Sequence, residues 1–261
     1  MRILYNILLF LLTPFYQLSL QNRVKKNKED PDRLKERYGI SNIARPSGNI
    51  IWLHAASVGE LNSIVPIIEF FARHYSVLIT TGTRSSAYVF QEKFGSAGTN
   101  IIHHYLPFDR VKYIRRFLAY WQPSQLIIAE SELWINLIFE ARHHDIKLTL
   151  LNARISEKSF QNWFWSKKFF KKLLANFEVI YPQSSADLGR FKQVHNNVQF
   201  IGNLKYAGLN KAIDKNALTK LRAKYSGKKL LLAASTHEGE QEVLIKVAKQ
   251  LGVHLILIPR H

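Results

Sequence analysis

The sequence predicts an α/β protein built on parallel, doubly wound sheets. Its short apolar runs are continuous rather than alternating, as is typical of strands that are covered on both faces. Longer segments of helical period separate these runs, so strand and helix alternate along most of the chain. With 261 residues, of which 47% are hydrophobic, the chain has enough apolar material for one or two domains.

The N-terminal segment is uncharged over residues 3–20 and is followed by one arginine and three lysines within 23–28. That apolar length lies at the lower limit of what spans a bilayer, roughly 17 to 25 residues. The basic cluster predicts that the rest of the chain stays cytoplasmic, whether the segment spans the membrane or lies in its surface. We therefore expect a membrane-anchor helix over 1–22 and a basic juxtamembrane segment over 23–48. A buried core helix is the alternative to the anchor.

A first domain is expected over residues 49–197, with six strands that alternate with helices. The predicted strands lie at 50–54, 76–81, 101–106, 125–130, 147–153 and 178–183. The predicted helices lie at 60–74, 84–94, 109–121, 133–144 and 157–177. Because a helix separates each strand from the next, the order predicts a parallel sheet.

The last of these helices carries an apolar stripe and a group of lysines on another side. The stripe consists of Trp163, Phe170, Leu173, Leu174 and Phe177, and the lysines are Lys168, Lys171 and Lys172. This pattern fits a core helix with a solvated basic face, and it fits equally a helix that lies on an anionic membrane. Both interpretations stay open.

A second domain is expected over residues 198–261. Its strands are predicted near 198–203, 229–235 and 253–259, and its helices near 214–225 and 238–251. No helix follows the last strand to cover the sheet, so we expect this second α/β unit to be cut short.

Composition limits the chemistry. Cysteine is absent, which excludes disulfides and thiolate metal sites. The histidines of the pairs at 103–104 and 143–144 diverge, so we expect no catalytic metal, and without Walker or dinucleotide spacing we expect no cofactor. The net charge of +18 favours anionic partners such as phospholipid headgroups. Nucleic-acid binding is not expected, because no nucleic-acid motif is visible.

Polar residues directly follow the predicted strands, where ligands bind in open parallel sheets. After the first strand come Ser57, Gly59 and Glu60, with Gly59 permitting a tight turn and Glu60 starting a helix. The Glu60 carboxylate either complements the helix dipole, worth about 0.3 to 1 kcal/mol, or acts as a general base toward a sugar hydroxyl. Glu130 and Glu132 follow the fourth strand, where structural and functional roles are both open.

Further along, Arg154 offers a planar fork for a carboxylate or phosphate, and Ser156 can cap the next helix. Lys205 suits a donor phosphate or carboxylate in a cleft, although an isolated lysine near a turn is more often solvated. The last polar turn joins a strand to a helix N-terminus, a backbone setting that favours anions. Its residues are Ser235, Thr236, His237 and Glu238.

Seven motifs resemble, in order, the Kdo transferases of lipopolysaccharide synthesis: HAASVGE, ESELW, NARIS, QSSAD, GNLKY, ASTHEGE and LIPRH. The resemblance implies a GT-B glycosyltransferase with an N-terminal acceptor-binding domain, a C-terminal nucleotide-sugar-binding domain and an active site in the cleft between them. It implies inverting single displacement of Kdo, an acidic eight-carbon sugar, from CMP-Kdo to the lipid A precursor lipid IVA. It also implies work at the cytoplasmic face of the bacterial inner membrane, with anionic lipid as a partner.

The same resemblance assigns roles to residues. Glu60 is then the general base, Glu130 and Lys205 stabilise charge in the transition state, and Pro259 and Arg260 contact CMP. Cationic help at the leaving phosphate is physically sensible, because CMP departs with negative charge. The remaining expected substrate-binding residues are Ser57, Gly59, Arg154, Ser235, Thr236, His237 and Glu238.

The chain departs from the family pattern in several places. Ile135 stands where family members usually have proline, and the loop at 80–86 differs from their threonine-rich loop. Two glycine-rich nucleotide-binding motifs of the family have no counterpart, so we expect weak or absent turnover from the chain as given. The alternative hypothesis is an inactive membrane-bound remnant that binds anionic lipid without transfer.

Overall fold

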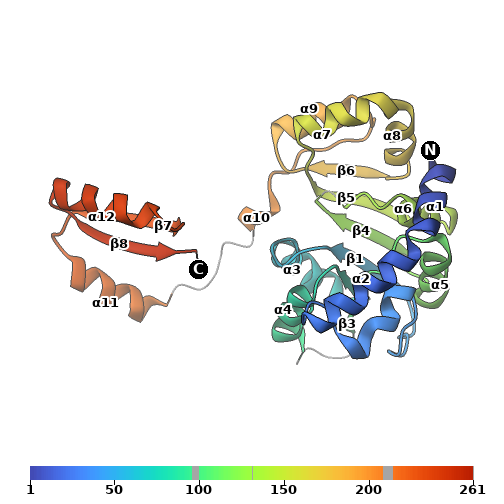
Figure 1. Ribbon diagram of the computed structural model, residues 1–261, viewed down its shortest axis with the longest axis horizontal. Coiled ribbons are helices and arrows are strands. Elements are labelled where there is room, and N and C mark those ends of the chain that lie inside the picture. The colour runs from blue at the N-terminus through green and yellow to red at the C-terminus, as the bar shows by residue number, and fades with distance from the viewer. Residues whose placement is uncertain (96–99, 131, 208–213, 261) are drawn as a thin grey trace. The chain divides into compact units, whose positions relative to one another are not determined.

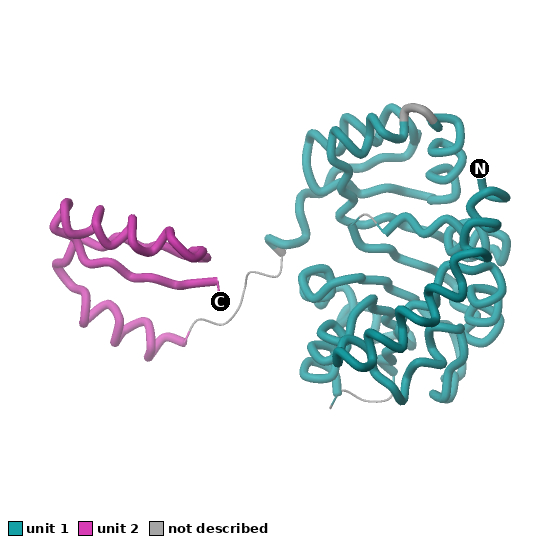
Figure 2. The backbone as a smooth tube through the Cα atoms, in the orientation of Figure 1, with its two compact units in different colours: residues 1–209 teal, residues 210–261 magenta. Residues whose placement is uncertain are grey.

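The computed structural model describes residues 1–95, 100–130, 132–207 and 214–260 (Figure 1). The chain divides into two compact units, unit 1 (residues 1–209) and unit 2 (residues 210–261) (Figure 2). Residue 131 of the ESELW motif and residue 261 of the LIPRH motif lie outside the described residues.

Unit 1 is built on a six-stranded sheet in the order β3-β2-β1-β4-β5-β6, and all neighbouring strands are parallel. The strands are β1 (Ile50–Ala55), β2 (Ser76–Thr81), β3 (Ile101–Tyr105), β4 (Gln125–Ala129), β5 (Lys147–Ala153) and β6 (Val179–Pro182). Each coincides with a predicted apolar run to within one residue. The prediction of a parallel, doubly wound sheet is confirmed, since the strand order runs outward from β1 and β4 in both directions.

Helices cover both faces of this sheet (Figure 1). They include α3 (Val58–Ala72), α4 (Arg84–Phe94), α5 (Val111–Trp121), α6 (Ile135–His143) and α9 (Ser185–Lys192). Successive β1 side chains point to opposite faces, so Trp52 packs in one core with Phe117, and Leu53 packs in the other with Leu61. The two apolar layers fix β1 at the centre of unit 1, with its carboxyl end in the middle of one edge.

The helix predicted over 157–177 is broken into three pieces. These are α7 (Glu157–Asn162), the 3₁₀ turn η2 (Trp163–Ser166) and α8 (Lys167–Leu174). The rings of Trp163 and Phe170 stack with centroids 4.8 Å apart, whereas seven residues along a continuous helix span about 10.5 Å. The break therefore lets both rings reach one core. Phe170, Leu173, Leu174 and Phe177 are buried, so the core interpretation of the apolar stripe is confirmed.

The N-terminal segment forms two helices instead of one. They are α1 (Arg2–Leu11) and α2 (Thr13–Lys25), and the chain bends by 55° between them. Among the described residues no single helix is long and apolar enough to cross a membrane, although the bent pair passes that test on length and composition. Leu9 and Leu20 are buried against unit 1, so both helices are packed on the fold.

Much of the expected basic juxtamembrane segment is packed against the sheet of unit 1. It contains the 3₁₀ helix η1 (Pro31–Tyr38), in which Glu36 and Arg37 are buried. Arg37 forms a buried ion pair with Glu29, and the Glu36 carboxylate accepts a hydrogen bond from the backbone of Tyr105 in β3. Buried charged side chains therefore fasten η1 to the edge of the sheet.

Residues 198–207 belong to unit 1, although the sequence placed the domain boundary before residue 198. The predicted strand at 198–203 is wrong: Val198 forms only an isolated parallel bridge with Ile180. The short helix α10 (Leu204–Ala207) follows, and Leu204 packs against the core that contains Leu53. These contacts hold the segment to unit 1 because they bury apolar side chains there.

Unit 2 contains two parallel strands and two helices. They are α11 (Lys215–Tyr225), β7 (Leu230–Thr236), α12 (Glu240–Leu251) and β8 (His254–Pro259). The predicted helix at 238–251 begins two residues later than expected, because Gly239 at φ 89° occupies the N-cap position. The strand and helix order is otherwise as the sequence predicted.

Candidate active site

Glu60 lies in the first turn of α3, directly beyond the carboxyl end of β1. Its carboxylate accepts hydrogen bonds from the Ala56 amide (2.8 Å) and the Ser57 hydroxyl (3.0 Å). In return, the Ser57 hydroxyl accepts a bond from the Glu60 amide at 3.3 Å, so the pattern resembles a capping box in which the carboxylate reaches the amide of Ala56 instead of that of the N-cap Ser57. The structural role of this carboxylate is therefore visible in the geometry, and it holds the side chain in one orientation.

The surroundings of Glu60 also suit a base. The residue is only 8% exposed. Burial raises its pKa, the two hydrogen bonds oppose that shift, and the charges of Glu132 and Glu130 raise it further. Burial likewise raises the pKa of Glu132, with a further rise from Glu130. Three carboxylates thus gather beyond β1 and β4, and a raised pKa brings a carboxylate toward the range of an efficient general base.

Gly59 does not form the predicted tight turn. It lies inside the first turn of α3, and a Cβ there would meet only the Ser57 hydroxyl oxygen, at 3.9 Å. The fold therefore does not require glycine at this position. The expected role of Gly59 in substrate binding stays a prediction.

Lys205 and Glu130 are brought together although 75 positions separate them in the sequence. Lys205 Nζ lies 2.8 Å from Glu130 Oε1, an ion pair without hydrogen-bond alignment. Glu130 has a left-handed backbone (φ 57°), and its amide donates to the Leu151 carbonyl of β5. The Lys205 side chain is 48% exposed, so its ammonium group is accessible to a ligand. The sequence named both residues but gave no signal that they touch.

Asn152 is a site residue that the sequence analysis overlooked. It is 1% exposed, has φ 54°, and its side-chain oxygen accepts a hydrogen bond from the Leu204 amide at 3.2 Å. That bond holds the start of α10 against the end of β5. The position of Lys205 beside Glu130 therefore depends on Asn152, whose place inside the NARIS motif was the available signal.

Replacing Asn152 with glycine is expected to loosen α10 without unfolding unit 1. Glycine accepts the left-handed backbone, so the loss is about one hydrogen bond, roughly 1 kcal/mol. Hydrogen exchange at the Leu204 amide should accelerate about fivefold. Urea unfolding checks that the fold is retained, and unchanged protection of Leu204 would show that Asn152 does not position this turn.

The NARIS turn confirms one further prediction. Ser156 caps α7 by accepting a hydrogen bond from the Ser159 amide at 3.1 Å. Arg154 is exposed on the same turn, beyond β5. Its expected contact with a substrate stays a prediction.

Unit 2 gathers the expected nucleotide-binding residues at the carboxyl ends of its two strands. Thr236 pairs with Pro259, and the Arg260 amide donates to the Thr236 carbonyl at 3.2 Å. The Arg260 guanidinium lies 3.4 Å from His237 Nε2. Thr236 is 6% exposed, and its hydroxyl has no partner among the described residues. A buried hydroxyl beside an exposed guanidinium and the start of α12 can receive an anion.

Two other expected residues accompany them. Ser235 has a left-handed backbone at φ 58°, which turns the chain toward α12. Glu238 is exposed in the turn before α12. Among the residues that the structure describes, no group of three or more His, Asp or Glu side chains could hold a metal ion.

A six-stranded parallel sheet and a following α/β unit, each with polar residues beyond its strands, agree with the GT-B type of fold. Residues 32–208 match the family described as 3-deoxy-D-manno-octulosonic-acid transferase (kdotransferase). The chain therefore belongs to the Kdo transferase family, as its seven motifs predicted.

Curated relatives agree over the whole chain. The 3-deoxy-D-manno-octulosonic acid transferase of Rickettsia bellii is 36% identical over 99% of this chain and 63% of its own length. The Haemophilus influenzae protein of the same name is 30% identical over 100% of this chain and 63% of its own. The chain thus spans about two-thirds of the length of these relatives.

Solved structures support the fold. UDP-GlcNAc 2-epimerase from Neisseria meningitidis, bound to UDP-GlcNAc, superposes with a TM-score of 0.55 at 11% identity, over 80% of this chain and 65% of that one. A putative UDP-N-acetylglucosamine 2-epimerase from Listeria monocytogenes gives the same TM-score and identity, over 81% and 62%. At this identity the likeness concerns the fold alone.

Proposed function

We propose that this protein transfers Kdo from CMP-Kdo to a hydroxyl of the lipid A precursor lipid IVA, by inverting single displacement. The observation that carries the proposal is Glu60: a nearly buried carboxylate with a raised pKa, held in one orientation at the carboxyl edge of the sheet. The relatives' shared name, 3-deoxy-D-manno-octulosonic acid transferase, supports the choice of transferred sugar.

The proposed displacement needs only one general base. Glu60 takes the proton of the acceptor hydroxyl as its oxygen forms a bond to the anomeric carbon of Kdo. The bond from that carbon to the phosphate oxygen breaks on the opposite side, and CMP leaves with the electron pair. In unit 1, Lys205, oriented by Glu130, offsets negative charge that develops in the step. In unit 2, Arg260 and the Thr236 hydroxyl are the proposed nucleotide-phosphate ligands.

Transfer is tested with the intact protein as its gene encodes it, with CMP-Kdo labelled in the sugar and with lipid IVA. CMP release is expected to match the appearance of Kdo-bearing lipid, with the configuration at the anomeric carbon inverted. Sugar release that proceeds equally without lipid IVA would indicate a hydrolase and refute the proposal. Retention of configuration would refute the single displacement.

We further propose that the protein works on the cytoplasmic face of the inner membrane, attached through the face of α1 that points away from unit 1. The inward face of α1 is mostly polar, with Leu9 as its buried apolar residue: Tyr5 donates to Asp109 at 2.9 Å, and Asn6 accepts from Asn136 at 2.7 Å. Arg2 also donates to Asn136, at 3.3 Å. A helix on a water-soluble domain normally has the opposite arrangement, with its apolar side inward.

The outward face of α1 is apolar. Six of its side chains are more than half exposed: Ile3, Leu4, Ile7, Leu8, Phe10 and Leu11. Inserting them into lipid is worth roughly 5 to 10 kcal/mol. The exposed Lys25, Lys26 and Lys28 at the end of the helix pair add attraction to anionic headgroups, about 1 kcal/mol each.

These contacts favour a helix that lies in the membrane surface over one that spans it. The ten residues of α1 extend only about 15 Å, half the thickness of the hydrocarbon core. Drawing α1 into a spanning position would also break its polar contacts with α6 and Asp109. The bend before α2 keeps both helices against unit 1 instead.

Insertion depth distinguishes the two arrangements. Because the sequence has no cysteine, Ile3→Cys and Leu11→Cys each carry a single spin label, with Lys25→Cys as an aqueous control. On phosphatidylethanolamine vesicles that contain phosphatidylglycerol, labels at 3 and 11 should lie at the same depth, within about 5 Å. A spanning helix would separate them by about 12 Å, and such a difference, or two aqueous labels, would refute surface attachment.

A further inference from the structure

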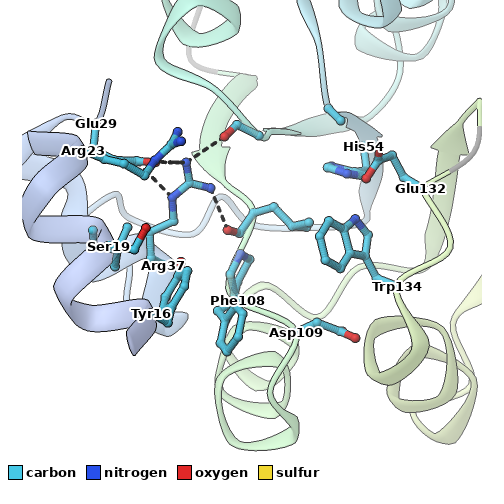
Figure 3. Close-up of a pocket in the computed structure, with 15 residues that line it drawn as sticks. Tyr16, Ser19, Arg23, Glu29, Arg37, His54, Phe108, Asp109, Glu132 and Trp134 are labelled. Carbon is cyan, nitrogen blue, oxygen red and sulfur yellow. Dashed lines mark hydrogen bonds and ion pairs between the residues drawn. The ribbon is translucent and has the colours of Figure 1, made fainter. Parts of the chain in front are cut away.

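A pocket of about 330 Å³ lies in unit 1 between α2 and the carboxyl ends of the central strands. Figure 3 shows Tyr16, Ser19 and Arg23 of α2 on one side of it. His54 of β1 and Trp134, which precedes α6, lie on the other (Figure 3). The pocket is of the size that suits a small ligand, at the lower end of the usual range.

His54 leaves one polar atom unsatisfied at this pocket. Its side chain is fully buried, and Nδ1 lies 2.9 Å from the Thr80 hydroxyl and 3.1 Å from the Thr80 carbonyl oxygen. Its Nε2 is buried and has no partner among the described residues. Burial lowers the pKa of His54 to about 4, so the ring is neutral near pH 7. A buried polar atom without a partner is costly, about 1 to 3 kcal/mol, unless a ligand or water satisfies it.

The charged side chains that line the pocket are largely paired with one another or with backbone groups. Arg23 and Arg37 share the carboxylate of Glu29, with Arg23 at 3.0 Å, and Arg37 also donates to the carbonyls of Leu106 and Gly82. Asp109 is likewise satisfied, because it accepts hydrogen bonds from the Tyr5 hydroxyl and from the amides of Asn136 and Leu137. Both arginines of the described lining are thus paired with a carboxylate, so the pocket suits a neutral, hydroxyl-rich group better than a phosphate.

The pocket is next to the proposed base. Ala56 lines it, and the Ala56 amide is the donor to the Glu60 carboxylate. Glu132, on the same side as His54, is close enough to raise the pKa of Glu60. A hydroxyl both donates and accepts, so it satisfies either tautomer of the imidazole.

We propose that this pocket binds a neutral amino-sugar ring of the acceptor, with His54 Nε2 hydrogen-bonded to one of its hydroxyls and α2 as the outer wall. The inference rests on the proposed function, which it extends by naming the acceptor subsite. Since α2 directly follows the proposed membrane helix α1 in the chain, an acceptor held in the lipid surface would have its sugar beside the pocket.

The test observes the imidazole of His54 directly, in the ¹⁵N-histidine-labelled chain titrated with N-acetylglucosamine, whose ring is neutral. We expect a saturable shift at His54 Nε2 and none at the other nine histidines. Inorganic phosphate at matched ionic strength should leave Nε2 unmoved. Absence of a shift with N-acetylglucosamine, or a larger shift with phosphate, would overturn the proposal.

Two substitutions on α2 serve as a matched pair that leaves the strands intact. Ser19→Trp fills the pocket from its outer wall and should abolish the shift with N-acetylglucosamine. Gln17→Trp places the same side chain at an exposed position that does not line the pocket, and the shift should persist. If both variants retain the shift, N-acetylglucosamine binds elsewhere and the proposal fails.

The outcome separates this inference from the proposed function. A protein that binds N-acetylglucosamine at His54 but transfers no Kdo would retain the subsite and lose the function. A protein that transfers Kdo while His54 shows no shift with N-acetylglucosamine would retain the function and lose the subsite.

Discussion

Glu60→Gln is expected to reduce transfer by about 10²- to 10⁴-fold while leaving the fold intact, the range that a positioned general base contributes. Glutamine can keep the capping geometry, because its carbonyl oxygen can accept from the Ala56 amide while its amino group donates to the Ser57 hydroxyl. Only the ability to take a proton is lost. The measurement is the rate of Kdo transfer to lipid IVA at saturating CMP-Kdo, whose own binding should be unchanged.

Glu69→Gln is the matched control, since Glu69 lies exposed on the same helix. It should transfer at the wild-type rate. If the Glu60→Gln variant also transferred Kdo at the wild-type rate, the role of Glu60 would be limited to its hydrogen bonds at the start of α3.

The pH dependence gives an independent check on Glu60. Burial raises its pKa, so the ionised base appears only as the pH rises through that raised value. Wild-type kcat/KM should therefore increase as the pH rises toward the raised pKa of Glu60, tenfold per pH unit at the acid end of this interval. The residual rate of the Glu60→Gln variant should not increase in this way. Stability moves the other way: the contribution of Glu60 is complete below its unfolded pKa and is lost as the pH rises through the folded pKa. The free energy of unfolding of Glu60→Gln relative to wild type should thus increase over the same interval.

Gly39→Ala is expected to lower the free energy of unfolding of unit 1 by about 3 kcal/mol or more. Gly39 ends η1 with φ 70°, and a Cβ there would lie 2.2 Å from the backbone oxygen of Tyr113 in α5. Backbone atoms cannot step aside as a flexible side chain can. Either η1 moves away from α5, which weakens the buried Glu29–Arg37 pair, or α5 itself shifts. Urea unfolding followed by tryptophan fluorescence measures the loss.

Gly48→Ala separates steric overlap from backbone strain. Gly48 has a similar φ of 82° but has nothing within 4 Å of the added Cβ. Its substitution should cost only the left-handed penalty, about 1 kcal/mol. Equal losses for the two variants would mean that the close approach of Gly39 to α5 contributes nothing.

The strands of unit 1 could be predicted from the sequence because each signal is local. A strand covered on both faces shows as a short, mostly apolar run of roughly four to eight residues, and β2 and β5 coincide with the predicted runs. The N-terminus of α7 was similarly readable, because Ser156 was predicted to cap it and does so. Motif order was sufficient for the family, and Glu60 and Glu130 followed from it.

Other features depended on segments far apart in the chain. The helix over 157–177 had an unbroken apolar stripe, yet it breaks so that Trp163 and Phe170 can fill one core. Residues 23–48 were predicted only as a basic juxtamembrane segment, yet Arg37 within it is buried because Glu29 and backbone carbonyls satisfy it. Burial of a charge depends on such partners, and a pattern of residue types does not reveal them.

The sequence by itself determined which residues form the strands, where polar groups follow them, and to which family the chain belongs. Only the tertiary structure decided that Lys205 meets Glu130 through Asn152, that His54 Nε2 lacks a partner, and that α1 turns its polar side inward. The physical reason is the separation along the chain between the residues that interact. Periodicity and capping act within one turn or one strand, whereas ion pairs, orphaned polar atoms and the outward face of a helix depend on which distant segments the packing brings into contact.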